Sequence, residues 1–88
     1  MSFQHQFPEF DASTLPTIPS TWTDLSWRND VCPSWAIGKV RVWVDFANPE
    51  EREFEDVNRF RVTDEDVAEI LFESNDWQAI LQFVEQNQ

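Results

Sequence analysis

The stretch KVRVWVDF, residues 39–46, is the clearest structural element in the sequence. Its side chains alternate between two classes along the chain. The apolar members, which fall on one side, are Val40, Val42, Val44 and Phe46. The members on the other side are Lys39, Arg41, Trp43 and Asp45. A period of two with β-branched residues is typical of a strand that buries one face, so this stretch predicts a central strand.

Shorter stretches on both sides of this strand favour further strands. They are TWTDLSWRND (21–30), CPSWAI (32–37) and EFEDVNRFRVT (53–63). Gly38 and NPEE (48–51) are typical of the turns between them. Pro33 confines CPSWAI to an edge or to the start of a strand, because proline has no N–H to donate to a sheet. Together these patterns predict a small antiparallel sheet of three or four strands.

The C-terminal third changes to a helical period. In SNDWQAILQFVEQ (74–86), apolar residues recur at the spacing i, i+3, i+4 and i+7. These residues are Trp77, Ile80, Leu81 and Val84. Ser74 or Asn75 can cap the helix that they predict.

The preceding stretch TDEDVAEILFES (63–74) fits two structures. Its Ala, Glu and Leu residues favour a helix. In a strand, by contrast, Ala68, Ile70 and Phe72 would share one face. We favour the helix, which gives an α+β fold with one or two C-terminal helices packed on one face of the sheet.

Residues 1–20, MSFQHQFPEFDASTLPTIPS, contain three prolines and no regular period. Because proline biases the preceding residue toward extended backbone, we expect an extended N-terminal arm. The remaining residues, 21–88, form one α+β domain. The aromatic side chains of the arm, Phe3, Phe7 and Phe10, either cover the core or bind a partner.

Composition excludes several classes of function. The chain has 88 residues, a net charge of −11, one His and one Cys. One histidine in the arm and a lone Cys32 offer no nucleophile–base pair and no zinc ligand set, so we expect no enzyme, metal or cofactor. Six basic residues are too few for direct binding to nucleic acid or to an anionic membrane. With no signal sequence, no apolar run of about 18 residues and no possible internal disulfide, a cytoplasmic location is expected.

The negative charge is concentrated after residue 48, where it suggests a binding surface. The candidate partner-binding carboxylates are Glu50, Glu51, Glu53, Glu55, Asp56, Asp64, Glu65, Asp66, Glu69 and Glu73. In an extended segment, residues two apart lie on one face about 6.6 Å apart, so Glu51, Glu53 and Glu55 would form a row. Such rows can imitate the charges of a nucleic-acid backbone. The predicted partner is therefore a basic protein surface, such as the nucleic-acid-binding groove of an enzyme.

In composition the chain is similar to phage-encoded DNA mimics and anti-CRISPR inhibitors, which are small, acidic, single-domain proteins without catalytic residues. This resemblance implies a non-enzymatic inhibitor. The alternative is a protein-interaction module that binds through exposed aromatic residues such as Trp43, while the charge serves solubility. Both functions remain open on the sequence, as does the oligomeric state.

Overall fold

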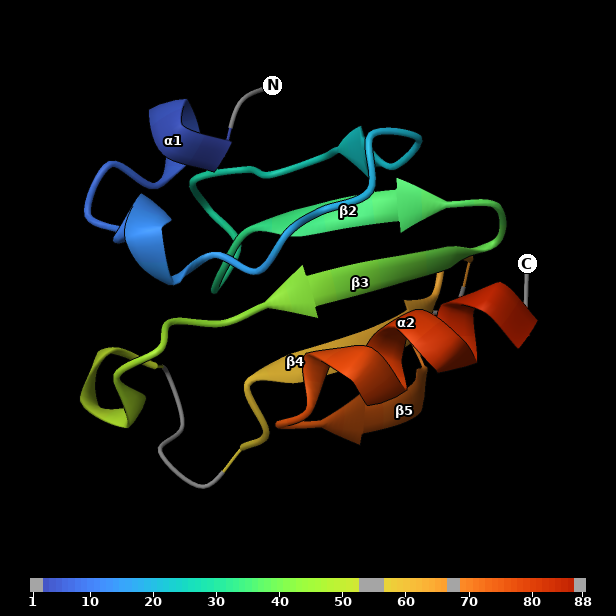
Figure 1. Cartoon of the computed structure of the whole chain (residues 1–88). Helices are drawn as coiled ribbons and strands as arrows, with labels where there is room; N and C mark the ends of the chain where they lie inside the picture. Colours follow the sequence, from blue (N-terminus) through green and yellow to red (C-terminus); the bar gives the residue numbers. More distant parts are fainter. Residues whose placement is uncertain (1–2, 53–56, 67–68, 87–88) are drawn as a thin grey trace.

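The computed structural model describes residues 3–52, 57–66 and 69–86, and its centre is an antiparallel sheet of five strands in sequential order (Figure 1). The strands are β1 Thr23–Asp24, β2 Ser34–Ile37, β3 Val40–Val44, β4 Phe60–Asp64 and β5 Ile70–Ser74. One longer helix, α2 Trp77–Gln86, follows the last strand. The α+β class is therefore confirmed, whereas the predicted number of three or four strands is wrong.

The predicted strand in 39–46 is β3, the middle strand of the sheet. Val42 of β3 lies between Trp35 of β2 and Val62 of β4, and Val44 pairs with Phe60. These valines are fully buried. The turn from β2 to β3 places Gly38 at a φ of +57°, a left-handed conformation that glycine adopts without the steric cost of a Cβ atom.

Helix α2 covers β4 and β5 on the valine side of the sheet (Figure 1). Ile80 and Val84 of its predicted apolar stripe are buried, and Trp77 lies with its ring 5.0 Å from that of Phe60. The helix was predicted to begin at a Ser74 or Asn75 cap, but it begins one or two residues later. The side chain of Asp76 accepts the Gln78 N–H, which makes Asp76 the N-terminal cap.

The helix expected within residues 63–74 is wrong, because Thr63 and Asp64 end β4, Glu65 and Asp66 lie in a turn, and Ile70–Ser74 form β5. Phe72 pairs with Val62 across the sheet and stacks on Phe83 of α2 with the ring centroids 4.9 Å apart. Burial of this aromatic pair outweighs the small helix preference of the neighbouring residues, since intrinsic preferences amount to tenths of a kcal/mol each.

The register of β5 shifts by one residue beside Val62 and Thr63, which leaves Leu71 as the extra residue of a β-bulge. Thr63 pairs with Ile70, while Val62 pairs with Phe72. Without a bulge, Ile70 and Phe72 would lie on one face, as the sequence pattern suggests. With the bulge, Phe72 packs on the core and Ile70 lies with Thr63 on the opposite face.

The N-terminal residues cover the rest of the valine side. They include two short helices, the α-helix α1 Phe3–Gln6 and the 3₁₀ helix η1 Ala12–Thr14, with extended backbone after them. Phe7 and Phe10 are buried in the core, and the Phe3 ring lies 5.7 Å from that of Trp35. The division into an arm (1–20) and a domain (21–88) stays a prediction.

Candidate interaction site

The face of the sheet opposite α2 is the candidate site, and we call it the open face. It carries the outward residues of the three strands β3 to β5, which are Arg41, Trp43, Arg61, Thr63, Ile70 and the acidic Glu73 that pairs with Arg61. Among the described residues, no helix packs on it. The loop between β1 and β2 lies at its β2 side, where Asp30 pairs with Arg41 at 3.4 Å.

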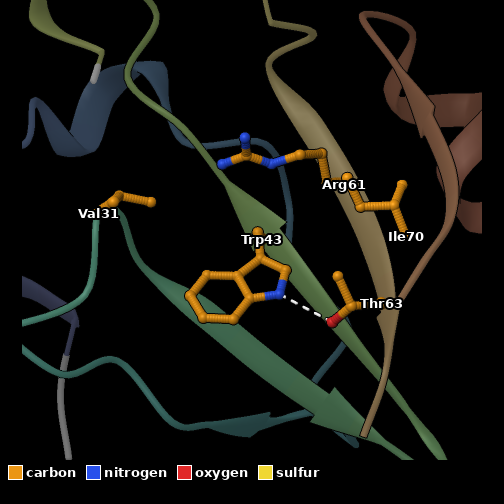
Figure 2. Close-up of a pocket in the computed structure, with 5 residues that line it drawn as sticks. All are labelled: Val31, Trp43, Arg61, Thr63 and Ile70. Carbon is orange, nitrogen blue, oxygen red and sulfur yellow. Dashed lines mark hydrogen bonds between the residues drawn. The ribbon is translucent and has the colours of Figure 1, made fainter. Parts of the chain in front are cut away.

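A hollow of about 220 Å³ lies in the open face (Figure 2). Its lining residues are Val31, Trp43, Arg61, Thr63 and Ile70. The apolar side chains of Val31 and Ile70 are 41% and 55% exposed. They come from opposite sides of the hollow, the β1–β2 loop and the edge strand β5. The lining is thus predominantly apolar and open to solvent.

Trp43 is held in a fixed orientation at the hollow. Its indole N–H donates a hydrogen bond of 3.0 Å to the Thr63 hydroxyl oxygen (Figure 2). The Arg41 guanidinium lies 4.4 Å from the centroid of the indole ring, within the range of a cation–π contact. Arg41 is itself bound to the Ser34 hydroxyl at 2.9 Å. Because these contacts fix the ring before any partner arrives, binding would cost little side-chain entropy.

A buried carboxylate positions the Arg61 side chain. One of its terminal nitrogens lies 3.5 Å from Asp45, which is only 2% exposed. The Cys32 sulfur lies 3.9 Å from the same nitrogen. Burial, reinforced by the charge of Asp45, raises the pKa of the Cys32 thiol to about 12, so the thiol stays protonated at neutral pH.

The position of Asp45 leads to a pH-dependent contribution to stability. Burial raises the pKa of this carboxyl above its ordinary value of 3.8, although the Phe46 N–H and the Arg61 guanidinium act in the opposite direction. At pH values between 3.8 and the raised pKa, the folded protein binds more protons at Asp45 than the unfolded chain does. This proton-linked part of the stability is therefore fully present below pH 3.8 and is lost as the pH rises through the raised pKa. It is separate from the Phe46 N–H hydrogen bond and the Arg61 ion pair, which the ionised carboxylate makes.

We expect the Asp45→Asn variant to lack this contribution. The free energy of unfolding of the wild type minus that of the variant should fall as the pH rises from 3.8 through the raised pKa. Urea unfolding of both proteins at several pH values measures this difference. A difference that grows with pH across that window would contradict the assignment.

The structure places the predicted acidic residues at both ends of the strands, so it does not gather them into one row. Glu50 and Glu51 lie in the turn η2 Pro49–Glu51, after β3. At the opposite end, the hairpin between β4 and β5 carries the members Asp64, Glu65, Asp66 and Glu69. Glu73 lies within β5 and accepts a hydrogen bond from Asn58. The remaining three, Glu53, Glu55 and Asp56, fall outside the described residues.

Two arginines near the acidic residues bind the backbone instead of carboxylates. Arg52 donates to the carbonyl oxygens of Phe46, Ala47 and Val57 at 2.7–3.2 Å. Arg59 donates to the carbonyl oxygens of Asp45 and Thr14. Within the described part of the chain, no ion pair involves the exposed carboxylates Glu50, Glu51, Glu65, Asp66 and Glu69. Their charge is therefore left for a partner or for solvent.

Of the residues at the hollow, only Trp43 was predicted from the sequence as a binding residue. Arg61, Thr63 and Ile70 were missed, and the alternation around Val62 could have placed Arg61 and Thr63 beside Trp43. Val31 lies in a loop without a period, and no sequence signal indicates the bulge that exposes Ile70.

No group of three or more His, Cys, Asp or Glu residues that could hold a metal ion occurs in the described ranges 3–52, 57–66 and 69–86. Likewise, no helix in these ranges has both the length and the apolar character required to cross a membrane. No protein-family model, curated protein or solved structure matches the chain. The functional inference therefore depends on the residues of the open face and of the hairpin beside it.

Proposed function

We propose that this protein is a non-enzymatic binding domain whose open face docks on a basic surface of a protein partner. The observation that carries the proposal is the pair of exposed apolar residues, Val31 and Ile70, on two sides of the hollow that contains Trp43. A fixed aromatic ring such as that of Trp43 is typical of an interaction hot spot, and apolar residues around it exclude water when a partner binds. The partner would share the cytoplasmic location that we expect for this chain.

Charge favours a basic partner. The net charge is −11, and the hairpin residues Glu65, Asp66 and Glu69 are exposed next to Ile70 in the chain. Complementary charges raise the rate of association and disfavour wrong partners more than they raise the final affinity. In this proposal the hollow supplies the affinity and the hairpin supplies the selection for Lys and Arg.

A second candidate function is inhibition of a nucleic-acid-binding enzyme by charge, as in DNA mimics and anti-CRISPR inhibitors. The observation that favours it is that Arg52 and Arg59 bind backbone carbonyls, while the described carboxylates Glu50 and Glu51 are exposed and have no ion pair among the described residues. In this candidate, Glu50 and Glu51 at one end and the hairpin at the other would bind the groove together.

Capture of partners from a lysate of the producing cells separates the two functions. The immobilised wild type is compared with a Val31→Ser, Ile70→Ser double variant and with a Glu65→Gln, Asp66→Asn, Glu69→Gln variant. We expect the first variant to weaken capture at least tenfold. We expect the second variant and raised salt to weaken capture less.

A Glu50→Gln, Glu51→Gln variant is the matched control at the opposite end of the sheet. If the open face is the interface, this control captures the partner as the wild type does. If it loses as much binding as the hairpin variant while the apolar variant keeps its partner, the charge-mimic function holds and the proposed one is wrong.

A further inference from the structure

The β-bulge at Leu71 decides what the open face presents, and bulges commonly re-aim a side chain at functional sites. An unbulged β5 would direct Ile70 toward α2, on the side where Phe72 lies. The bulge instead brings Ile70 beside Thr63 and Trp43, where it is 55% exposed. Because exposure of an isoleucine to water is unfavourable in the free protein, burial of Ile70 by a partner would remove apolar surface from water and favour binding.

From these observations we propose that the hollow binds one bulky apolar side chain of a partner segment, and that Ile70 and Val31 pack against this side chain. In the partner segment, Lys or Arg residues lie next to the apolar residue. This inference rests on the proposed function and specifies the partner chemistry. The volume of about 220 Å³ lies below the roughly 300–1,000 Å³ typical of small-molecule sites, which suits a single side chain better than a cofactor.

The charges around the hollow specify the residues next to this anchor. Glu69 precedes Ile70 directly, and Glu65 and Asp66 lie in the same hairpin. An extended segment advances about 3.3 Å per residue, so basic residues within a few positions of the anchor can reach these carboxylates. A second copy of this chain is disfavoured as the occupant, because two acidic hairpins would be brought together.

The positive charge of Arg61 does not reverse the preference of the hollow for a partner segment with basic residues. Its guanidinium is paired with the buried Asp45, which balances its charge locally. The lining of the hollow therefore presents no unbalanced positive charge, whereas the exposed hairpin beside it is negative. An apolar anchor with basic neighbours complements both features.

Titration with short capped peptides, followed by ¹H–¹⁵N NMR, tests this inference without knowledge of the partner. The first peptide has a central Leu between two pairs of Lys, the second has Ala in place of Leu, and the third keeps Leu but has Glu in place of Lys. We expect the first peptide to shift the amide signals of Val31 and Ile70 and the indole N–H signal of Trp43. The second and third should bind at least tenfold more weakly.

The matched protein variants are Ile70→Ser and Trp27→Ser. Trp27, in the segment after β1, is also a large apolar residue and is 40% exposed, but it is not among the residues that line the hollow. Ile70→Ser should weaken binding of the Leu–Lys peptide about tenfold, while Trp27→Ser should leave the affinity for this peptide unchanged. Because both residues are exposed, melting temperatures should stay near the wild-type value.

Three results would overturn the inference. The first is that the peptide, even at millimolar concentration, shifts no signals of residues at the hollow. The second is equal binding of the Leu and Ala peptides. The third is that the signals shift with protein concentration in the absence of peptide, which would indicate binding of a second copy. If the Val31→Ser, Ile70→Ser variant still loses partner capture, the open face remains the interface and only the anchor chemistry is wrong. If that variant keeps its partner, the proposed function itself fails.

Discussion

The Trp77→Ala variant should lose about 3–5 kcal/mol of the free energy of unfolding, the range for removal of a large aromatic side chain from a packed site. The Trp77 ring lies 5.0 Å from that of Phe60 in the sheet and 5.7 Å from that of Trp22 near the N-terminal region. Trp77 therefore joins α2 to the sheet and to the segment before β1, which contains Trp22. Urea unfolding followed by circular dichroism measures the change. For a domain of this size, such a loss approaches the total stability.

The Trp77→Phe variant is the control for this experiment. The Trp77 indole N–H is buried and has no hydrogen-bond partner among the described residues. Phenylalanine keeps the aromatic contact with Phe60 but fills less volume than the indole, which lowers the stability. It also removes the unpaired donor, whose burial costs about 1–3 kcal/mol, which raises the stability. Because these two effects offset each other, we expect a change below about 1 kcal/mol. A loss as large as that of Trp77→Ala would contradict this packing.

The second large effect is expected at Asp45. Asp45→Ala should cost about 3 kcal/mol, near the lower limit for a buried ion pair from which one partner is removed. The change removes the acceptor of the Phe46 N–H and leaves Arg61 without its counter-charge. Since the Arg61 side chain is 15% exposed, part of its charge can still be solvated, which keeps the loss at the lower limit. Thermal and urea unfolding at pH 7 measure the loss.

The matched control is Asp30→Ala at the second described ion pair. Asp30 and Arg41 are 31% and 24% exposed, and pairs accessible to solvent contribute about 0–1 kcal/mol. We therefore expect a small change. Equal losses for Asp30→Ala and Asp45→Ala would mean that burial does not distinguish the two pairs and would contradict the role of Asp45.

Strict periodicity explains which parts of the fold could be predicted. Residues 39–46 and the stripe from Trp77 to Val84 each have one apolar face, and each forms the predicted element. Residues 70–74 fit both a helix and an alternating strand in the sequence, and the bulge places Ile70 on the face opposite to the one that simple alternation predicts. Their strand depends on the contact of Phe72 with Phe83, which only the folded chain brings together.

The candidate site was less predictable than the fold. The position of Trp43 on the outer face followed from alternation, but the side chains around it come from a loop and from a bulged strand. The acidic pattern indicated a charged surface, yet the hairpin and η2 place its described members at opposite ends of the strands. Linear spacing does not predict this separation, since it depends on the antiparallel return of β4 along β3.

Site-specific photocrosslinking tests the central claim, that the open face is the interface, most directly. A photoreactive benzoylphenylalanine replaces Val31, Ile70 or Gln82 in separate proteins, which are then irradiated with the captured partner. Gln82 is exposed on α2, the helix that covers the other side of the sheet. We expect crosslinks to the partner from positions 31 and 70 and none from position 82. Crosslinks from position 82 together with none from positions 31 and 70 would contradict the assignment of the open face as the interface.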